Sequence, residues 1–85
     1  MILARTEHFK REFSRLPASL KNRAEKQLAL LLHNPSHPSL RVEKMRGYPD
    51  IWVGRITEGY RFTFQIAGTR CLLRRIGTHD VLKRP

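Results

Sequence analysis

The hydrophobic residues in the first third of the chain recur every three or four positions, which is the period of a helix with one buried face. Phe9, Phe13 and Leu16 follow this spacing and predict an amphipathic helix over residues 7–16. Thr6 precedes it and is the candidate N-cap, because its hydroxyl can accept a hydrogen bond from the first turn.

A second helix is expected to run from Pro17 or Ser19 to about His33, since a proline stops one helix and can open the next. One face is apolar and the opposite face is mostly basic. Such a basic face is either simply solvated or binds a partner, and the sequence leaves both readings open. The apolar positions are Leu20, Ala24, Leu28, Leu31 and Leu32, and the opposite face carries Lys21, Arg23, Lys26 and Gln27.

The pattern changes to alternation after a loop over residues 34–39, which contains two prolines. Leu40, Val42 and Met45 alternate with charged residues and predict a strand. Short turns containing glycine separate the later apolar segments. The expected strands are residues 2–4 at an edge of the sheet, 40–45, 51–56, 60–66 and 70–76, and residues 77–85 are expected to form a basic tail.

The strand over residues 60–66 alternates most clearly. Its aromatic and aliphatic side chains are expected to face the core and its polar side chains the other side of the sheet, because successive side chains of a strand point in opposite directions. Trp52 is expected to anchor the core as well. The core-facing set is Tyr60, Phe62, Phe64 and Ile66, and the opposite set is Arg61, Thr63 and Gln65.

Two helices followed by consecutive hairpins predict one α+β domain over residues 1–85, with both helices packed on one face of a small, mostly antiparallel sheet. The short apolar start does not read as a signal peptide, and no apolar run approaches the ~18 residues of a membrane span. The single cysteine, Cys71, lies in an apolar run and reads as a core residue. We therefore expect a soluble cytoplasmic protein.

The net charge is the feature of the composition that says most about the partner of this chain. The 85 residues include 17 Lys and Arg against 7 Asp and Glu, which gives a formal net charge of +10. Arginine dominates the excess, and its planar guanidinium binds phosphate through two parallel hydrogen bonds. Nucleic acid is the partner that this charge favours, with anionic lipid or an acidic protein segment as alternatives.

The strands carry several arginines and lead to a His79-Asp80 step. Such a set suits RNA cleavage without a metal, in which the ribose 2′-OH attacks phosphorus. That reaction needs cations for the phosphorane charge and a group that titrates near neutrality to transfer a proton. His33 and His37 flank the proline loop, but their spacing across helix breakers matches no helical pair of ligands. No metal and no cofactor are expected.

Four motifs, taken in order, resemble the RelE/ParE superfamily of bacterial toxins. They are Asn-Pro-x-His-Pro-x-Leu-Arg at residues 34–41, Gly-x-x-Asp-x-Trp at 47–52, Gly-Tyr-Arg at 59–61 and Arg-Ile-Gly-Thr-His-Asp at 75–80. The resemblance covers nearly the whole chain and implies a RelE-like fold and the toxin of a type II toxin–antitoxin pair. Many members cut messenger RNA in the ribosome, and another branch inhibits DNA gyrase.

The resemblance also implies roles for individual residues. Arg61 falls where RNA-cleaving members contact the scissile phosphate, Arg55 falls on a basic position of the preceding strand, and His79 falls where some members carry the general acid. The chain departs from the pattern at Val53, where a second basic residue is expected, and at Leu82 or Lys83, where an aromatic residue is expected.

We therefore expect an endoribonuclease that acts on ribosome-bound mRNA, with Arg55, Arg61 and His79 as catalytic residues and a cognate acidic antitoxin as protein partner. The alternatives are a gyrase inhibitor that cuts nothing and a binding module without activity. Arg61 could instead form a salt bridge to Glu58 or Asp50, and His79 could be a plain surface histidine. Further RNA contacts are expected from Arg74, Arg75, Lys83 and Arg84.

Overall fold

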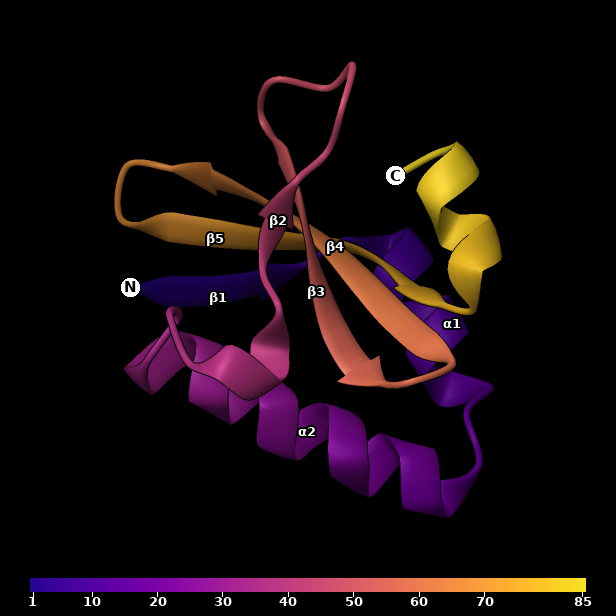
Figure 1. Ribbon diagram of the computed structural model, residues 1–85. Helices are drawn as coiled ribbons and strands as arrows, with labels where there is room; N and C mark the ends of the chain where they lie inside the picture. The colour runs from indigo at the N-terminus through magenta and orange to yellow at the C-terminus, as the bar shows by residue number, and fades with distance from the viewer.

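A five-stranded sheet in the order β1-β5-β4-β3-β2 forms the centre of the computed structural model, which describes residues 1–85 (Figure 1). β1 runs parallel to β5, and all other neighbours are antiparallel. The predicted α+β class and the edge position of the first strand are confirmed. The elements are β1 (Ile2–Arg5), α1 (Glu7–Ser14), α2 (Ala18–His33), the 3₁₀ helix η1 (Pro38–Leu40), β2 (Glu43–Lys44), β3 (Ile51–Thr57), β4 (Tyr60–Ala67), β5 (Arg70–Gly77) and the 3₁₀ helix η2 (His79–Lys83).

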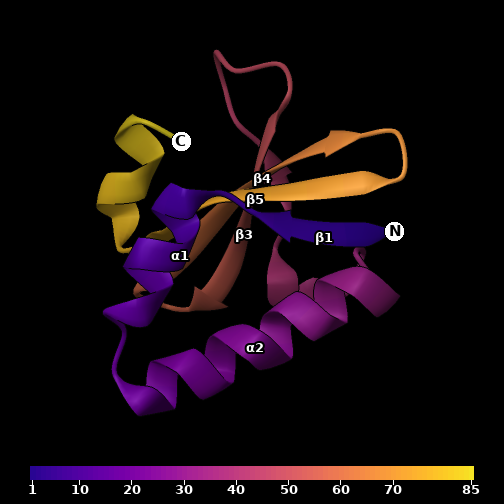
Figure 2. The same ribbon diagram turned by 180° about the vertical axis from the view of Figure 1, so that it is seen from behind.

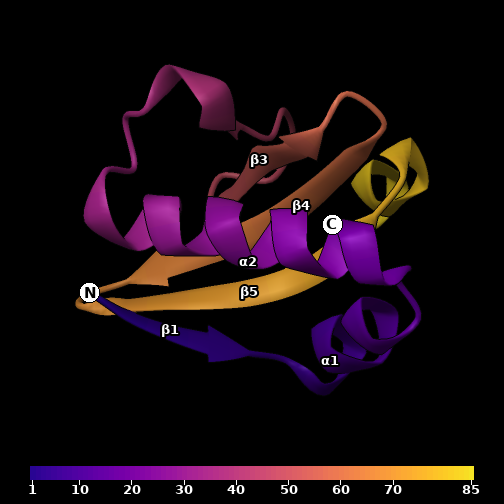
Figure 3. The same ribbon diagram turned by 90° about the horizontal axis from the view of Figure 1, so that it is seen from below.

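Both helices begin as the sequence predicts. The Thr6 hydroxyl accepts a hydrogen bond from the Phe9 main-chain N–H at 3.0 Å and so caps α1, and Pro17 is the N-cap of α2. α2 crosses one face of the sheet (Figure 3), and α1 lies at the end of β1 and packs against β5 (Figure 2). Phe9 of α1 and Leu28 of α2 are buried in the same hydrophobic cluster, so the two helices and the sheet share one core.

Gln27 departs from the expected helix pattern. It was expected on the polar face of α2, opposite the apolar one, but it is only 7% exposed. Its side-chain amide donates hydrogen bonds to the main-chain oxygens of Ser39 at 3.4 Å and Arg55 at 3.0 Å. A buried amide is stable here because its donors are satisfied, and it ties α2 to both η1 and β3.

The strand expected over residues 40–45 is wrong in most of its length. Only Glu43 and Lys44 pair with β3, and Leu40 instead ends the 3₁₀ helix η1 with its side chain fully buried. His37 explains the change, because its ring Nδ1 accepts the Ser39 main-chain N–H at 3.1 Å and caps this short helix.

β4 keeps its alternation only up to a β-bulge. Thr63 pairs with Arg75 and Phe64 with Leu73, so Arg74 is an extra residue in β5. Thr63, expected on the open face, is fully buried and its hydroxyl has no hydrogen-bond partner. Ile66, expected in the core, is 47% exposed because it lies at the end of β4 beside the turn.

The expected basic tail is an ordered segment. η2 packs against β4 and β5, and Val81 is buried against the sheet. Gly77 makes this return possible, because a Cβ at that position would lie 2.9 Å from Val81 Cγ1. The segment is fastened further along, where Arg74 Nε donates to the Pro85 main-chain oxygen at 3.1 Å and Arg75 Nη1 donates to that of Arg84 at 3.0 Å.

Candidate nucleic-acid interface

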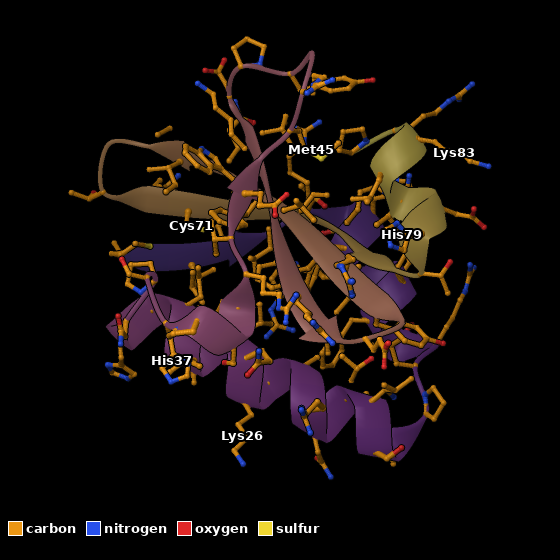
Figure 4. The ribbon with its side chains drawn as sticks, in the orientation of Figure 1. Lys26, His37, Met45, Cys71, His79 and Lys83 are labelled. Atoms are coloured by element: carbon orange, nitrogen blue, oxygen red, sulfur yellow. The ribbon has the colours of Figure 1, made fainter.

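The strand register brings the three candidate catalytic residues to one end of the sheet. Arg55 of β3 lies directly opposite Arg61 of β4, and Arg61 lies opposite Gly77 of β5. His79 follows two residues later and opens η2, where Figure 4 labels it. Positions 55 and 61 are therefore neighbours in space, and position 79 follows two residues after Gly77, the residue paired with Arg61.

The guanidinium of Arg61 folds over the turn between β3 and β4. Its Nη1 donates to the main-chain oxygens of Thr57 at 2.6 Å, Glu58 at 2.9 Å and Tyr60 at 3.0 Å. The salt bridge to Glu58 or Asp50 that the sequence left open does not form. Nε and Nη2 of Arg61 donate to no protein atom, so one edge of the guanidinium is oriented by the turn and the other is available to a ligand.

Positive charge accumulates around Arg61. Burial, followed by the charges of Arg55 and Arg41, lowers the pKa of Arg61, while Glu58 and Glu43 oppose the shift. Neither Arg41 nor Arg55 forms an ion pair. Like charges directly opposite each other destabilise a sheet, and a bound anion relieves that repulsion. This end of the sheet therefore carries positive charge that no acidic residue of the chain neutralises through an ion pair.

Arg75, expected to bind RNA, instead takes part in a largely buried ion pair with Glu12 of α1. Its Nη2 lies 2.7 Å from Glu12 Oε2 and its Nε lies 3.1 Å from Oε1, which also accepts the Ile76 main-chain N–H at 3.3 Å. Burial raises the pKa of Glu12, but the hydrogen bonds from Arg75 and Ile76 and the charge of Arg75 outweigh it, and the pKa is lowered. The same hydrogen bond raises the pKa of Arg75.

Arg74 also uses its guanidinium for hydrogen bonds within the protein, since its Nη1 donates to Gln65 Oε1 at 3.1 Å and its Nε donates to the Pro85 main-chain oxygen. The two arginines of the bulge thus hold α1 and the C-terminal segment to the sheet. Of the expected RNA ligands, Lys83 and Arg84 remain exposed, and Lys83 lies 3.5 Å from Asp80 across the surface.

His79 is exposed and its side chain makes no hydrogen bond within the protein. Asp80 faces Lys83 rather than the imidazole, so the His79-Asp80 step is not a hydrogen-bonded pair. The ring is open to a substrate that reaches this end of the sheet.

Arg41 is the residue near this site that sequence reasoning missed. It follows η1 with φ +45°, and it is the one residue other than glycine with a positive φ. No signal in the sequence predicts a left-handed conformation for an arginine. It lines the same hollow as Arg55, which places it beside the candidate site, and its charge contributes to the lowered pKa of Arg61.

No group of three or more His, Cys, Asp or Glu side chains lies close enough together to hold a metal ion. No helix has the length and hydropathy to cross a membrane.

No protein-family model matches the chain. No curated protein matches it either. Solved structures match across nearly the whole chain, and the likeness defines the RelE-like fold shared by toxins of type II toxin–antitoxin systems.

Three of these structures show the extent of the match. A YoeB/ParE toxin from Agrobacterium tumefaciens has a TM-score of 0.79 at 20% identity and covers 93% of this chain and 99% of its own. YafQ from E. coli BL21(DE3) has a TM-score of 0.79 at 13% identity and covers 94% of each chain. A chain of the intact E. coli RelBE toxin–antitoxin complex has a TM-score of 0.73 at 22% identity and covers 91% of this chain and 94% of its own.

Proposed function

We propose that this chain is the toxin of a toxin–antitoxin pair and acts as a metal-independent endoribonuclease on mRNA in the ribosome. The observation that supports the proposal most strongly is the juxtaposition of Arg55 and Arg61, two cations opposite each other with no acidic partner. The RelE-like fold is shared with YafQ and with the toxin of the RelBE complex.

In this reaction the ribose 2′-oxygen forms a bond to phosphorus and the bond from phosphorus to the 5′-oxygen breaks. The 2′-OH proton leaves to a base, and the products are a 2′,3′-cyclic phosphate and a 5′-hydroxyl. Arg55 and Arg61 stabilise the negative charge that develops on the phosphoryl oxygens. His79 donates a proton to the departing 5′-oxygen, a role that contributes ~10²–10⁴ in rate.

Substituting Arg61 tests the phosphate contact. Arg61→Gln keeps a donor for the turn carbonyls but removes the cation. Single-turnover cleavage of ribosome-bound mRNA is expected to fall by about 10²-fold or more. Arg70→Gln, which removes an exposed arginine at the other end of the sheet, serves as the matched control. Cleavage at the wild-type rate by a folded Arg61 variant would contradict the assignment.

His79→Gln tests the proton transfer, because glutamine hydrogen-bonds but does not titrate. RNA affinity is expected to stay within about threefold, since binding depends on the arginines. The single-turnover rate is expected to fall by ~10²-fold or more. Wild-type cleavage by this variant would remove His79 from the mechanism and make Lys83 or Arg84 the next candidates.

Gyrase inhibition is the second candidate function. Val53 lies opposite Thr63 in the middle of β3. RNA-cleaving members of the RelE/ParE superfamily, which this chain resembles, carry a basic residue at that position, so its absence favours a function without cleavage. If the purified chain cuts no RNA on or off the ribosome, a gyrase supercoiling assay decides between this function and a binding module without activity.

The proposed protein partner is a cognate acidic antitoxin. The net charge of +10 favours an acidic partner, and a structurally similar toxin was crystallised in the RelBE complex. Co-expression with an adjacent small acidic reading frame is expected to restore growth and to yield a co-purifying complex. Failure of both would contradict this pairing.

A further inference from the structure

A basic groove runs between α2 and η1, away from His79. Two hollows, of about 550 and 600 Å³, share Arg23, Gln27 and Ser39 in their linings and so adjoin one another. We call them together the α2–η1 groove. In Figure 4, Lys26 and His37 mark this side of the molecule, whereas His79 and Lys83 lie on η2. The arginine, lysine and histidine residues of its lining are Arg23, Lys26, His33, His37, Arg41 and Arg55.

The groove has a fixed shape. The hydrogen bonds from Gln27 to the main-chain oxygens of Ser39 and Arg55 set the separation of α2, η1 and β3. His37 holds η1 in place, because its Nδ1 accepts from the Ser39 N–H at 3.1 Å and lies 2.9 Å from the Ser39 hydroxyl. A ligand would therefore meet a preformed surface.

The cations of the groove are not used within the protein. None of Arg23, Lys26, Arg41 and Arg55 takes part in an ion pair, and Glu58 is the one acidic residue in the lining. This contrasts with Arg75, whose charge is neutralised by Glu12 at 2.7 Å.

The length of α2 along this groove suits the row of phosphates of a stacked single strand. Arg23, Lys26, Leu30 and His33 follow each other at intervals of three and four residues, so they form one stripe of the helix. Ten residues of α-helix rise about 15 Å. Phosphates of a stacked strand rise about 3.4 Å per nucleotide, so the stripe matches about four of them.

Arg41 adds an independent observation. A left-handed conformation is costly for an arginine, and a glycine would adopt it without that cost. Residues with strained backbone cluster at binding and active sites, and here the conformation of Arg41 brings a guanidinium to the same hollow as Arg55.

We propose that the α2–η1 groove binds the phosphodiester backbone of single-stranded RNA, which runs from Arg55 at the candidate site toward Lys26 and His33 on α2. The identification of the polyanion as RNA rests on the proposed function, whereas the phosphate chemistry rests on the groove itself. An acidic amphipathic peptide needs large apolar side chains in the groove to receive its own apolar face. The apolar residues of the lining are the small Ala29, the half-buried Leu30, Pro38 and the buried Ile56, so such a peptide fits less well than a chain of phosphates.

The test compares two double variants of equal charge. Arg23→Gln/Lys26→Gln removes two cations from the groove, and Arg11→Gln/Arg15→Gln removes two exposed cations from the end of α1, outside it. The probe is a fluorescently labelled single-stranded RNA, and its affinity is measured over a series of salt concentrations. The groove variant is expected to lose about 1.4 from the slope of log K against log salt, and about tenfold in affinity at physiological salt.

Arg41→Gly separates binding from folding. Its Tm is expected to equal or exceed that of the wild type, while RNA affinity falls about fourfold through the loss of one phosphate contact. A combination of lower affinity and undiminished Tm supports the proposal.

Three outcomes would overturn the proposal. The first is a control variant that loses as much affinity as the groove variant, which would show an effect of net charge alone. The second is an unaltered slope in the groove variant while the wild type still cleaves RNA, which rejects the groove and keeps the ribonuclease. The third is a groove variant that binds RNA normally but no longer binds a co-expressed acidic protein. Conversely, a wild type that binds with a groove-dependent slope but cleaves nothing keeps the groove and rejects the proposed ribonuclease.

Discussion

Replacing Glu12 with glutamine tests whether the ion pair between α1 and β5 stabilises the domain. Glu12 and Arg75 are 16% and 21% exposed at their side chains, and the carboxylate accepts two hydrogen bonds from Arg75 and one from the Ile76 N–H. Glutamine retains one acceptor oxygen but loses the charge and the second acceptor, so Arg75 is left partly buried without its counter-ion.

The size of the effect follows from these contacts. A hydrogen bond to a charged group contributes roughly 1.5–3 kcal/mol, and breaking a fully buried ion pair costs about 3–5 kcal/mol. Because the pair is partly exposed and one acceptor remains, we expect Glu12→Gln to lower the free energy of unfolding by about 2 kcal/mol. For a domain of this size that corresponds to a fall in Tm of roughly 8–16 °C.

The loss should depend on pH. The pKa of Glu12 is lowered in the folded protein from its ordinary value of 4.5. The unfolded chain therefore binds more protons in this range, and the stabilisation is complete above pH 4.5 and disappears as the pH falls through the lowered value. The raised pKa of Arg75 affects stability only in strong alkali, so at lower pH the wild type and the variant should converge only as the pH falls through the lowered pKa of Glu12.

Thermal unfolding monitored by circular dichroism at neutral and acidic pH measures both effects. Glu7→Gln on the same helix is the control, since its salt bridge to Lys10 is exposed and contributes little. A difference in Tm below 2 °C at neutral pH, or a loss that does not shrink in acid, would refute the reasoning. Arg75 would then be available for RNA, as the sequence had suggested.

Three other predictions concern the core. Gly54→Ala is expected to lower the free energy of unfolding in urea by about 1–3 kcal/mol, because the new Cβ would lie 2.4 Å from the Phe62 ring. Gly59→Ala is the control, since its new Cβ would meet nothing within 4 Å, and an equal loss in the two variants would contradict the reasoning. Thr63→Val is expected to be neutral or to stabilise by about 1 kcal/mol, since it removes a buried hydroxyl without a partner, and a clear loss of stability would reveal one. Cys71 is fully buried and burial raises the pKa of its thiol to about 11, so thiol reagents at pH 8 should modify it only after unfolding; rapid labelling of the native protein would show that this part of the core opens.

The periodicity of the sequence determined the main elements and the fold class. Spacings of three and four residues placed Phe9 and Leu28 on the buried faces of two helices, and alternation placed Phe62 and Phe64 in the core. These are local properties, because the side-chain period of a helix or strand is fixed by its backbone geometry. The short turns between β3, β4 and β5 make these strands pair as consecutive hairpins. This pairing places Arg55 opposite Arg61 and Arg61 opposite Gly77.

Only the tertiary structure decided which charges are free. Arg75 and Arg61 are both strand arginines in the sequence, yet one is neutralised by Glu12, which is 63 positions away, and the other keeps an open edge above a turn. The bulge at Arg74 and the left-handed Arg41 likewise have no local signature. A charged side chain carries the same local pattern whether or not it has a partner, and its partner is set by long-range packing, so the total charge follows from the sequence alone, whereas the fold decides where that charge can act.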